Sequence, residues 1–253
     1  MAKCSYTTTY YDHDLGREES YKCPDEEHSE GLCKFHLKGY SADEKNQEEL
    51  IELLKQKIAD ANASESPLKW IGYQIPPEFA IIYEFKINVY VDGANFIGNV
   101  NFSRSIFNKN ASFSNATFNR EVDFSTAMFN REAHFFNATF NREANFSTTT
   151  FNEKVDFSTT IFNQEALFLG TTFNREANFS TTTFNEKVDF STATFNLEAH
   201  FFNATFNREA LFLGTTFNQA LFLGTTFNQE VDFSTTTFNI EADFLGATFN
   251  RQT

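Results

Sequence analysis

The amino-acid sequence predicts a mainly β fold that is built from short repeats, and two observations lead to this prediction. The chain holds 34 phenylalanines among its 253 residues, a share far above the usual one. From Phe96 to Phe249 the phenylalanines recur at alternating intervals of 6 and 5 residues. Neither interval fits the 3.6-residue period of an α-helix, and Thr and Phe favour strands whereas Asn favours turns.

A small residue stands two positions before each of these phenylalanines, such as Ala144 before Phe146 and Val155 before Phe157. Strand side chains alternate in direction, so both members of such a pair point to the same side. Pairs of one large and one small residue fill a narrow core well. We therefore predict a phenylalanine core, represented by Phe124, Phe146, Phe157, Phe168, Phe179 and Phe190.

The first segment, residues 1–40, contains all three cysteines of the chain. An odd number of cysteines argues against a disulfide framework, whereas three thiolates and one imidazole form the tetrahedral shell of a structural zinc site. Cys33 and His36 are three residues apart and can bind from one tight turn. We predict a structural zinc ion as cofactor, with Cys4, Cys23, Cys33 and His36 as its ligands.

Two alternatives to this ligand set stay open. His13 or His28 could take the place of His36, and the three thiols could instead be reduced and without a metal. In the predicted set, four protein ligands leave no position for an activated water, which disfavours a catalytic metal.

The second segment, residues 41–93, is expected to be an N-terminal cap made of a helix and a strand. Residues 41–63 read as the helix, because Ser41 and Glu44 have the spacing of a capping box and an apolar stripe follows. Residues 81–91 alternate between apolar and other side chains, as in a half-buried strand. The stripe consists of Leu50, Ile51, Leu54 and Ile58, and the strand positions are Ile81, Tyr83, Phe85, Ile87, Val89 and Val91.

The third segment, residues 94–253, resembles the pentapeptide-repeat family. Its units, such as ANFST at 144–148 and VDFST at 155–159, match that family's repeat of a small residue, Asp or Asn, Leu or Phe, and two variable residues. Members of the family fold as right-handed four-sided β-helices with one unit on each side. The resemblance implies a quadrilateral parallel β-helix solenoid of about seven coils, preceded by a small α+β zinc-binding module and the cap.

The N-terminal segment carries a second, narrower likeness. The stretches CKFH at 33–36 and IGYQIP at 71–76 are similar to a Cys/His segment that precedes the solenoid in some archaeal members of the family. This resemblance implies an archaeal type of protein.

Every second unit of the repeat carries a sixth residue, such as Glu143 or Lys154, which we expect to bulge at a corner. One unit, FNQALF from Phe217, lacks it. The twenty residues from Phe140 return unchanged from Phe173. With 22 residues in a coil, this offset of 33 residues places the two copies on opposite faces, which argues for expansion of a structural module.

The charge of −14 and the pI of about 4.8 disfavour direct binding to nucleic acid and to anionic membranes. The first residues form no apolar signal region, and eighteen consecutive apolar residues occur nowhere, so we predict a cytoplasmic protein. We also predict that it is not an enzyme, since it has no recognisable nucleophile motif, phosphate-binding loop or carboxylate pair.

The favoured function is a structural scaffold, a rigid rod that binds an unidentified protein partner. The first alternative is an acidic DNA mimic that modulates a type II topoisomerase, as some pentapeptide-repeat proteins do. Residues 95–253 carry 16 acidic and 10 basic side chains, which leaves a net charge of −6. This net charge is small compared with the about 20 negative charges on a DNA duplex of similar length. A remote alternative is an ice-binding lattice formed by outward Thr-x-Asn rows.

Residues that break the repeat pattern are candidates for an interaction surface. These outward apolar residues are Leu167, Leu169, Leu211, Leu213, Leu221, Leu223, Phe136 and Phe202. Several lie in the last coils, where an uncovered solenoid end exposes strand edges, so we predict a homodimer that pairs through the C-terminal coils. His134 and His200 are expected on the surface as variants of the repeat, without a catalytic role.

Overall fold

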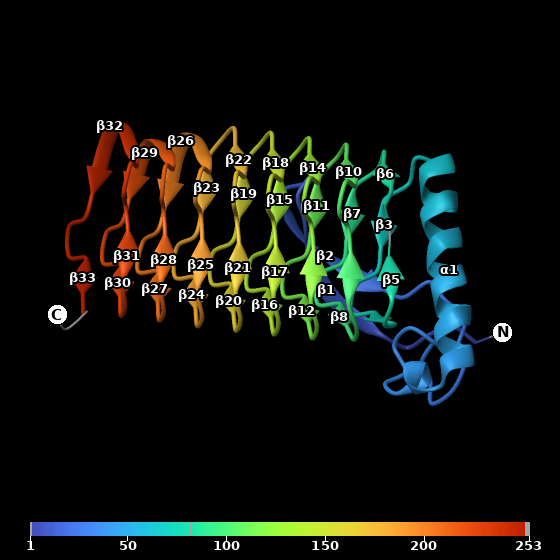
Figure 1. Ribbon diagram of the computed structural model, residues 1–253. Helices are drawn as coiled ribbons and strands as arrows, with labels where there is room; N and C mark the ends of the chain where they lie inside the picture. Colours follow the sequence, from blue (N-terminus) through green and yellow to red (C-terminus); the bar gives the residue numbers. More distant parts are fainter. Residues whose placement is uncertain (1, 81, 251–253) are drawn as a thin grey trace.

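The computed structural model, which describes residues 2–80 and 82–250, winds most of the chain into a parallel β-solenoid of about eight coils (Figure 1). Each coil has four faces, and each face is a ladder of short strands whose partners lie about one coil of 22 residues away in the sequence. The predicted four-sided solenoid is therefore confirmed. Within the described residues, no helix has the length and apolar character needed to cross a membrane.

We name the four faces A to D in the order in which the chain visits them. Face A consists of β3 (Leu68–Lys69), β7 (Val89–Tyr90), β11 (Ala111–Ser112), β15 (Ala133–His134), β19 (Val155–Asp156) and β23 (Ala177–Asn178). Face B consists of β4 (Gln74–Ile75), β8 (Asn95–Phe96), β12 (Thr117–Phe118), β16 (Thr139–Phe140), β20 (Ile161–Phe162), β24 (Thr183–Phe184), β27 (Thr205–Phe206), β30 (Thr226–Phe227) and β33 (Thr248–Phe249).

The other two faces follow the same rule. Face C consists of β5 (Phe79–Ala80), β9 (Val100–Asn101), β13 (Val122–Asp123), β17 (Ala144–Asn145), β21 (Ala166–Leu167), β25 (Val188–Asp189), β28 (Ala210–Leu211) and β31 (Val231–Asp232). Face D consists of β6 (Glu84–Phe85), β10 (Ile106–Phe107), β14 (Met128–Phe129), β18 (Thr150–Phe151) and β22 (Thr172–Phe173). In the last coils β26 (Thr194–His200), β29 (Thr216–Leu221) and β32 (Thr237–Asp243) run from face D round the corner to face A.

Stacked phenylalanines fill the interior. All six predicted core phenylalanines are fully buried. Phe157 stacks on Phe135 and Phe179, with ring centroids 4.7 and 5.0 Å apart and nearly parallel planes. It meets Phe146 edge to face, at 5.3 Å and 85°. Each ring therefore has aromatic neighbours both along and across the rod, in the geometries that aromatic pairs prefer.

The polar residues of the repeat form hydrogen bonds at the turns and at the corners of each coil. The Oδ1 atom of Asp156 accepts a hydrogen bond of 2.9 Å from the backbone N–H of Ser158, which explains why Asp or Asn precedes the core residue. The buried hydroxyl of Thr149 donates to the carbonyl of Phe124 at 2.8 Å. Asn163 donates to Asn141 one coil away, and Asn185 donates in turn to Asn163. Such amide ladders link successive coils at the corners.

The repeated twenty-residue block lies on opposite faces, as expected. Its first copy begins with Phe140 on face B, and its second copy begins with Phe173 on face D. The unit after Phe217 is one residue shorter, and the corner between faces D and A accommodates the difference. The register shifts there, and pairing resumes between Gln219 and Glu198. The corner therefore tolerates loss of the sixth residue.

The solenoid begins earlier than the repeat pattern indicates. Strand β3 at Leu68 already pairs with β7, so the first coil uses residues that we assigned to the cap. The single strand predicted over residues 81–91 is wrong: β6 and β7 lie on two different faces with a corner between them. The error has a physical cause. On each face of a coil two inward side chains stand two positions apart, and this is also the spacing of inward side chains along one longer strand. Ile81 lies outside the described residues.

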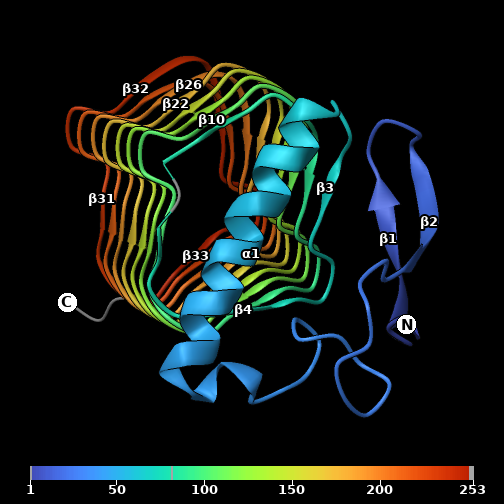
Figure 2. The ribbon, with the colours of Figure 1, turned by 90° about the vertical axis from the view of Figure 1, so that its right-hand side faces the viewer.

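Helix α1 (Glu44–Ala63) lies across the open end of the first coil (Figure 2). Its buried stripe contains Leu50, Leu54 and Ile58, while Ile51 is half-buried. The predicted capping box is wrong in detail. Asp43 is the N-cap and accepts hydrogen bonds from the N–H groups of Lys45 and Asn46, and Ser41 belongs to the short 3₁₀ helix η1 (Tyr40–Ala42) before it.

The N-terminal hairpin runs along the outside of face A (Figure 2). It consists of β1 (Thr7–Asp12) and β2 (Arg17–Lys22), which pair in antiparallel fashion. The carboxylate of Asp12 accepts hydrogen bonds from Tyr10 of the hairpin at 3.1 Å and from Tyr90 of face A at 3.2 Å. The hairpin is therefore tied to the solenoid through buried polar contacts as well as through packing.

Phe157→Ala tests the stacked core. Because the cavity opens between two stacked rings that cannot collapse freely, we expect the free energy of unfolding to fall by about 3–5 kcal/mol. Urea denaturation followed by circular dichroism measures the change. Leu169→Ala is the control, since this side chain is 44% exposed and should change stability by no more than about 0.5 kcal/mol. Equal effects of the two changes would contradict the proposed role of the core.

Candidate metal centre

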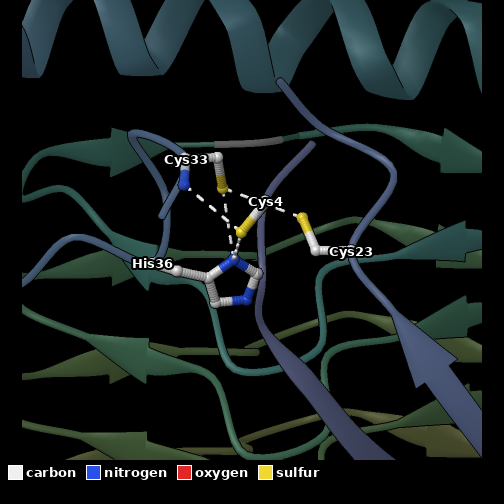
Figure 3. Close-up of side chains that lie close together, drawn as sticks. All are labelled: Cys4, Cys23, Cys33 and His36. Atoms are coloured by element: carbon white, nitrogen blue, oxygen red, sulfur yellow. Dashed lines mark hydrogen bonds between the residues drawn. The ribbon is translucent and has the colours of Figure 1, made fainter. Parts of the chain in front are cut away.

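The structure brings Cys4, Cys23, Cys33 and His36 together in one buried cluster (Figure 3). Cys4 stands just before β1 and Cys23 just after β2, so the antiparallel hairpin places these two thiols side by side. Cys33 and His36 come from the loop that follows. The ligand atoms of the four residues all lie within 4.8 Å of one another, and the cluster can hold a metal ion.

Backbone hydrogen bonds shape the loop that carries two of these ligands. The carbonyl of Cys33 accepts from the N–H groups of His36 and Leu37 at 3.1 and 3.0 Å, which closes a tight turn. The N–H of Cys33 donates to the sulfur of Cys4 at 3.2 Å. A backbone donor aimed at a sulfur atom stabilises a thiolate, the form in which cysteine binds metals.

The separations within the cluster match a tetrahedral metal site. At usual zinc distances, two sulfur ligands lie about 3.8 Å apart, and a sulfur and a nitrogen about 3.6 Å apart. The Cys23 and Cys33 sulfurs are 3.7 Å apart, and the Cys4 sulfur is 3.6 Å from Nδ1 of His36. The Cys33 sulfur is 3.2 Å from the same nitrogen. Two of these separations are within about 0.1 Å of the values for a zinc-sized tetrahedron, and the third is about 0.4 Å shorter.

Neighbouring groups orient the ligands. The Nε2 atom of His36 lies 3.0 Å from the carbonyl of Ile71 in the first coil. A hydrogen bond there places the ring proton on Nε2 and leaves the Nδ1 lone pair free for a metal. The ring of Tyr6 stacks on His36 with centroids 3.8 Å apart. The contact with Ile71 joins the Cys/His cluster to the solenoid.

A buried carboxylate lies next to the sulfur atoms. Asp25 is 3.6 Å from the Cys23 sulfur and 4.0 Å from the Cys33 sulfur. Burial acts to raise the pKa of Asp25, but hydrogen bonds from Lys57 of α1 and from Tyr73 outweigh it and lower the pKa. Asp25 therefore stays ionised and connects the cluster to the capping helix.

The two thiols nearest to Asp25 differ in their protonation. A hydrogen bond from the Cys23 thiol lowers the pKa of Cys33, in spite of its burial. The pKa of Cys23 is raised, because its thiol donates to Cys33 and is itself buried. One thiolate is thus favoured even without a metal.

The alternative ligands considered from the sequence lie elsewhere. His28 packs edge to face against Tyr40, with centroids 4.9 Å apart. His13, in the turn of the hairpin, stacks on His134 of face A, with centroids 3.4 Å apart and planes 8° from parallel. His36 is therefore the histidine of the cysteine cluster.

The sequence predicts His134 on the surface, and this prediction is wrong. The side chain is buried, with 8% of its surface exposed. The hairpin covers it, and a local sequence pattern contains no information about a segment that packs from outside. Between the hairpin and face A lies a cleft of about 780 Å³, whose lining includes His13, Glu132 and His134. Burial lowers the pKa of His13 to about 4 and that of His134 to about 3. His200, at the equivalent place in a later copy of the motif, is half-buried beside Glu198.

The predicted interaction residues divide between two opposite faces. Phe136, Phe202, Leu221 and Leu223 lie on face A, whereas Leu167, Leu169, Leu211 and Leu213 lie on face C. Phe136, Leu169 and Leu213 are exposed, and the others are half-buried. On face A, Phe202, Leu223 and Leu245 lie in one column through three successive coils.

A family model described as pentapeptide repeats (9 copies) matches residues 92–139. The same spacing continues beyond the match to Phe249. Searches of curated proteins and of solved structures found no match.

Asp92, which also lines the cleft, gives a test of the burial of this region. It is 6% exposed, its Oδ1 accepts from Ser112 at 2.7 Å, and burial raises its pKa to about 7. The unfolded chain loses this proton near pH 4, so ionising Asp92 costs stability as the pH rises from about 4 to about 7. We expect Asp92→Asn to be more stable than the wild type at pH 8 by up to about 4 kcal/mol.

The advantage of Asp92→Asn should shrink as the pH falls and vanish below about pH 4, where both side chains are neutral. Urea titrations between pH 4 and 8 measure it. The matched control is Asp123→Asn, which changes a half-buried carboxylate on face C. A stability gain from Asp92→Asn that does not depend on pH would contradict the assignment.

Proposed function

Because residues 92–139 match the pentapeptide-repeat family and the same repeat continues to Phe249, we propose that this chain is a pentapeptide-repeat protein and a non-enzymatic scaffold, a rigid rod that binds a protein partner. We further propose that a structural zinc ion fastens its N-terminal module and that it works in the cytoplasm. The unpaired thiols of Cys4, Cys23 and Cys33 agree with a reducing compartment.

The observation that carries the scaffold proposal is the unbroken column of stacked rings along the rod. Neighbouring rings in a column lie between 4.4 and 5.4 Å apart, and the faces add a backbone ladder at every coil. Such a structure resists bending, because bending must open stacked rings and hydrogen bonds together. Rigidity suits a spacer or a platform for another protein.

The charges favour a scaffold over a DNA mimic. Salt bridges join acidic and basic side chains one coil apart, as between Lys154 and Glu176 at 2.8 Å and between Lys187 and Glu165 at 3.6 Å. A mimic of duplex DNA needs rows of unpaired acidic groups. The ice-binding alternative likewise gains no support, since the corner Asn side chains bond to one another in ladders.

Besides its unidentified protein partner, we propose that the chain binds a second copy of itself through the C-terminal coils. Ile240, Leu245 and Phe249 are 72%, 74% and 54% exposed. Among the described residues, strands β31, β32 and β33 are the last in their ladders, and their outer edges have no strand partner. Exposed strand edges next to apolar side chains favour association.

Light scattering coupled to gel filtration tests this pairing. At micromolar concentration we expect twice the mass of 29.0 kDa, and we expect the double change Ile240→Glu and Leu245→Glu to yield monomers. Leu169→Glu together with Met128→Glu is the control, since it places the same charges on exposed positions far from the end. A monomeric wild type would exclude the dimer.

Elemental analysis tests the zinc proposal. We expect one tightly held zinc ion per chain, and Cys23→Ser should weaken its binding by more than about 100-fold, because a thiolate ligand is lost. His28→Ala should keep the metal, since this histidine lies outside the cluster. The proposal fails if the protein purifies without metal and takes up no zinc, or if His28→Ala loses zinc while His36→Ala retains it.

A further inference from the structure

A second group of metal-binding side chains lies outside the cysteine cluster, where the tip of the hairpin meets face A. His13 comes from the turn between β1 and β2, and Glu132 and His134 come from β15 and the corner before it. One ligand atom from each of the three residues lies within 4.8 Å of the other two. The residues line the cleft between the hairpin and the solenoid.

The Nε2 atoms of the two histidines in this group make no hydrogen bond among the described residues. Both atoms, one on His13 and one on His134, are buried. Leaving a buried polar atom unpaired costs about 1–3 kcal/mol. Two such atoms lie at one place, on histidine rings that stack on each other. This indicates that a bound ion or molecule supplies the missing partner.

The separation between His134 and Glu132 fits a bound metal ion. Nε2 of His134 is 3.4 Å from Oε2 of Glu132, and the pair lacks hydrogen-bond geometry. Nitrogen and oxygen ligands of one tetrahedral zinc-sized ion lie about 3.4 Å apart. We propose that His13, Glu132 and His134 bind a second divalent transition-metal ion, which fastens the hairpin to the fourth coil.

The surrounding charges suit a cation. Asp156 pairs with His134 across the face A ladder and adds a carboxylate to the lining of the cleft. Lys154 also lines the cleft, but its ammonium is engaged by Glu176 at 2.8 Å. Two imidazoles and a carboxylate select ions such as Zn²⁺, Co²⁺ and Ni²⁺. With three protein ligands, this site keeps a fourth position open toward the cleft, unlike the closed cysteine site.

Binding requires one local movement. The two rings are nearly parallel, and a ring nitrogen donates in the plane of its ring. The rings must therefore tilt apart to direct both lone pairs at one ion. His13 is the ring that can move, since it is only half-buried and stands in a turn.

The chain contains its own control. The nine residues EAHFFNATF occur at 132–140 and again at 198–206, so His200 and Glu198 repeat the local pair. His200 contacts Glu198 at 2.9 Å and Glu176 at 3.8 Å, and within the described residues it belongs to no three-residue cluster. The sequence motif alone is therefore not sufficient, and the third ligand must come from the hairpin.

Cobalt titration of the full-length, zinc-loaded protein tests the proposal. We expect a further equivalent of Co²⁺ to bind, with visible absorption bands of nitrogen and oxygen ligation and without the strong sulfur-to-metal charge transfer of the cysteine site. His13→Asn should weaken this binding at least tenfold, and His200→Asn should leave it unchanged. Circular dichroism checks that both variants are folded.

Three results would overturn the proposal: no Co²⁺ beyond the cysteine site, undiminished binding by His13→Asn, or an equal loss in His200→Asn. The cysteine zinc is measured in the same samples by elemental analysis. Failure of the second site is thereby distinguished from failure of the first.

Discussion

The stacking of aromatic rings along the rod is the interaction on which the rest of the structure depends. Phe124, Phe146, Phe168 and Phe190 follow one another at 22-residue intervals, with successive centroids 5.0, 5.1 and 4.7 Å apart. This spacing is close to the distance between hydrogen-bonded strands, about 4.8 Å. The rings and the backbone ladders therefore reinforce each other, and each coil prescribes the position of the next.

A solenoid of this kind has an exposed apolar cross-section where it begins, and the N-terminal residues cover it. Helix α1 places Leu50, Leu54 and Ile58 against the first coil. The cysteine cluster lies between the helix and the hairpin, with Lys57 bound to Asp25 on one side and His36 next to Ile71 on the other. Since these segments are too short for a core of their own, a bound metal is an effective way to hold them together.

Much of the architecture could be predicted because the repeat is local. Within residues 94–253 the small residue at one position and the phenylalanine two places later recur in every unit, so one correctly interpreted unit predicts them all. The first coil has no such uniformity: Ile75, Phe79 and Phe85 fill it in place of a regular phenylalanine series. Alternation at Phe85, Ile87 and Val89 fits one strand as well as two, and only pairing with later coils separates these possibilities.

The two clusters of candidate metal ligands show where a sequence is informative about a site. Cys4, Cys23, Cys33 and His36 could be grouped from sequence because cysteine is rare in this chain and its chemistry is specific. His13 and His134 are 121 positions apart and carry no spacing signal; they meet because the hairpin folds back along face A. The sequence by itself determined the repeat, its inward residues and the grouping of the three cysteines, since these depend on residue type and short periods. The tertiary structure alone decided which segment covers which face, because packing between distant segments depends on their shapes and on the position of each coil.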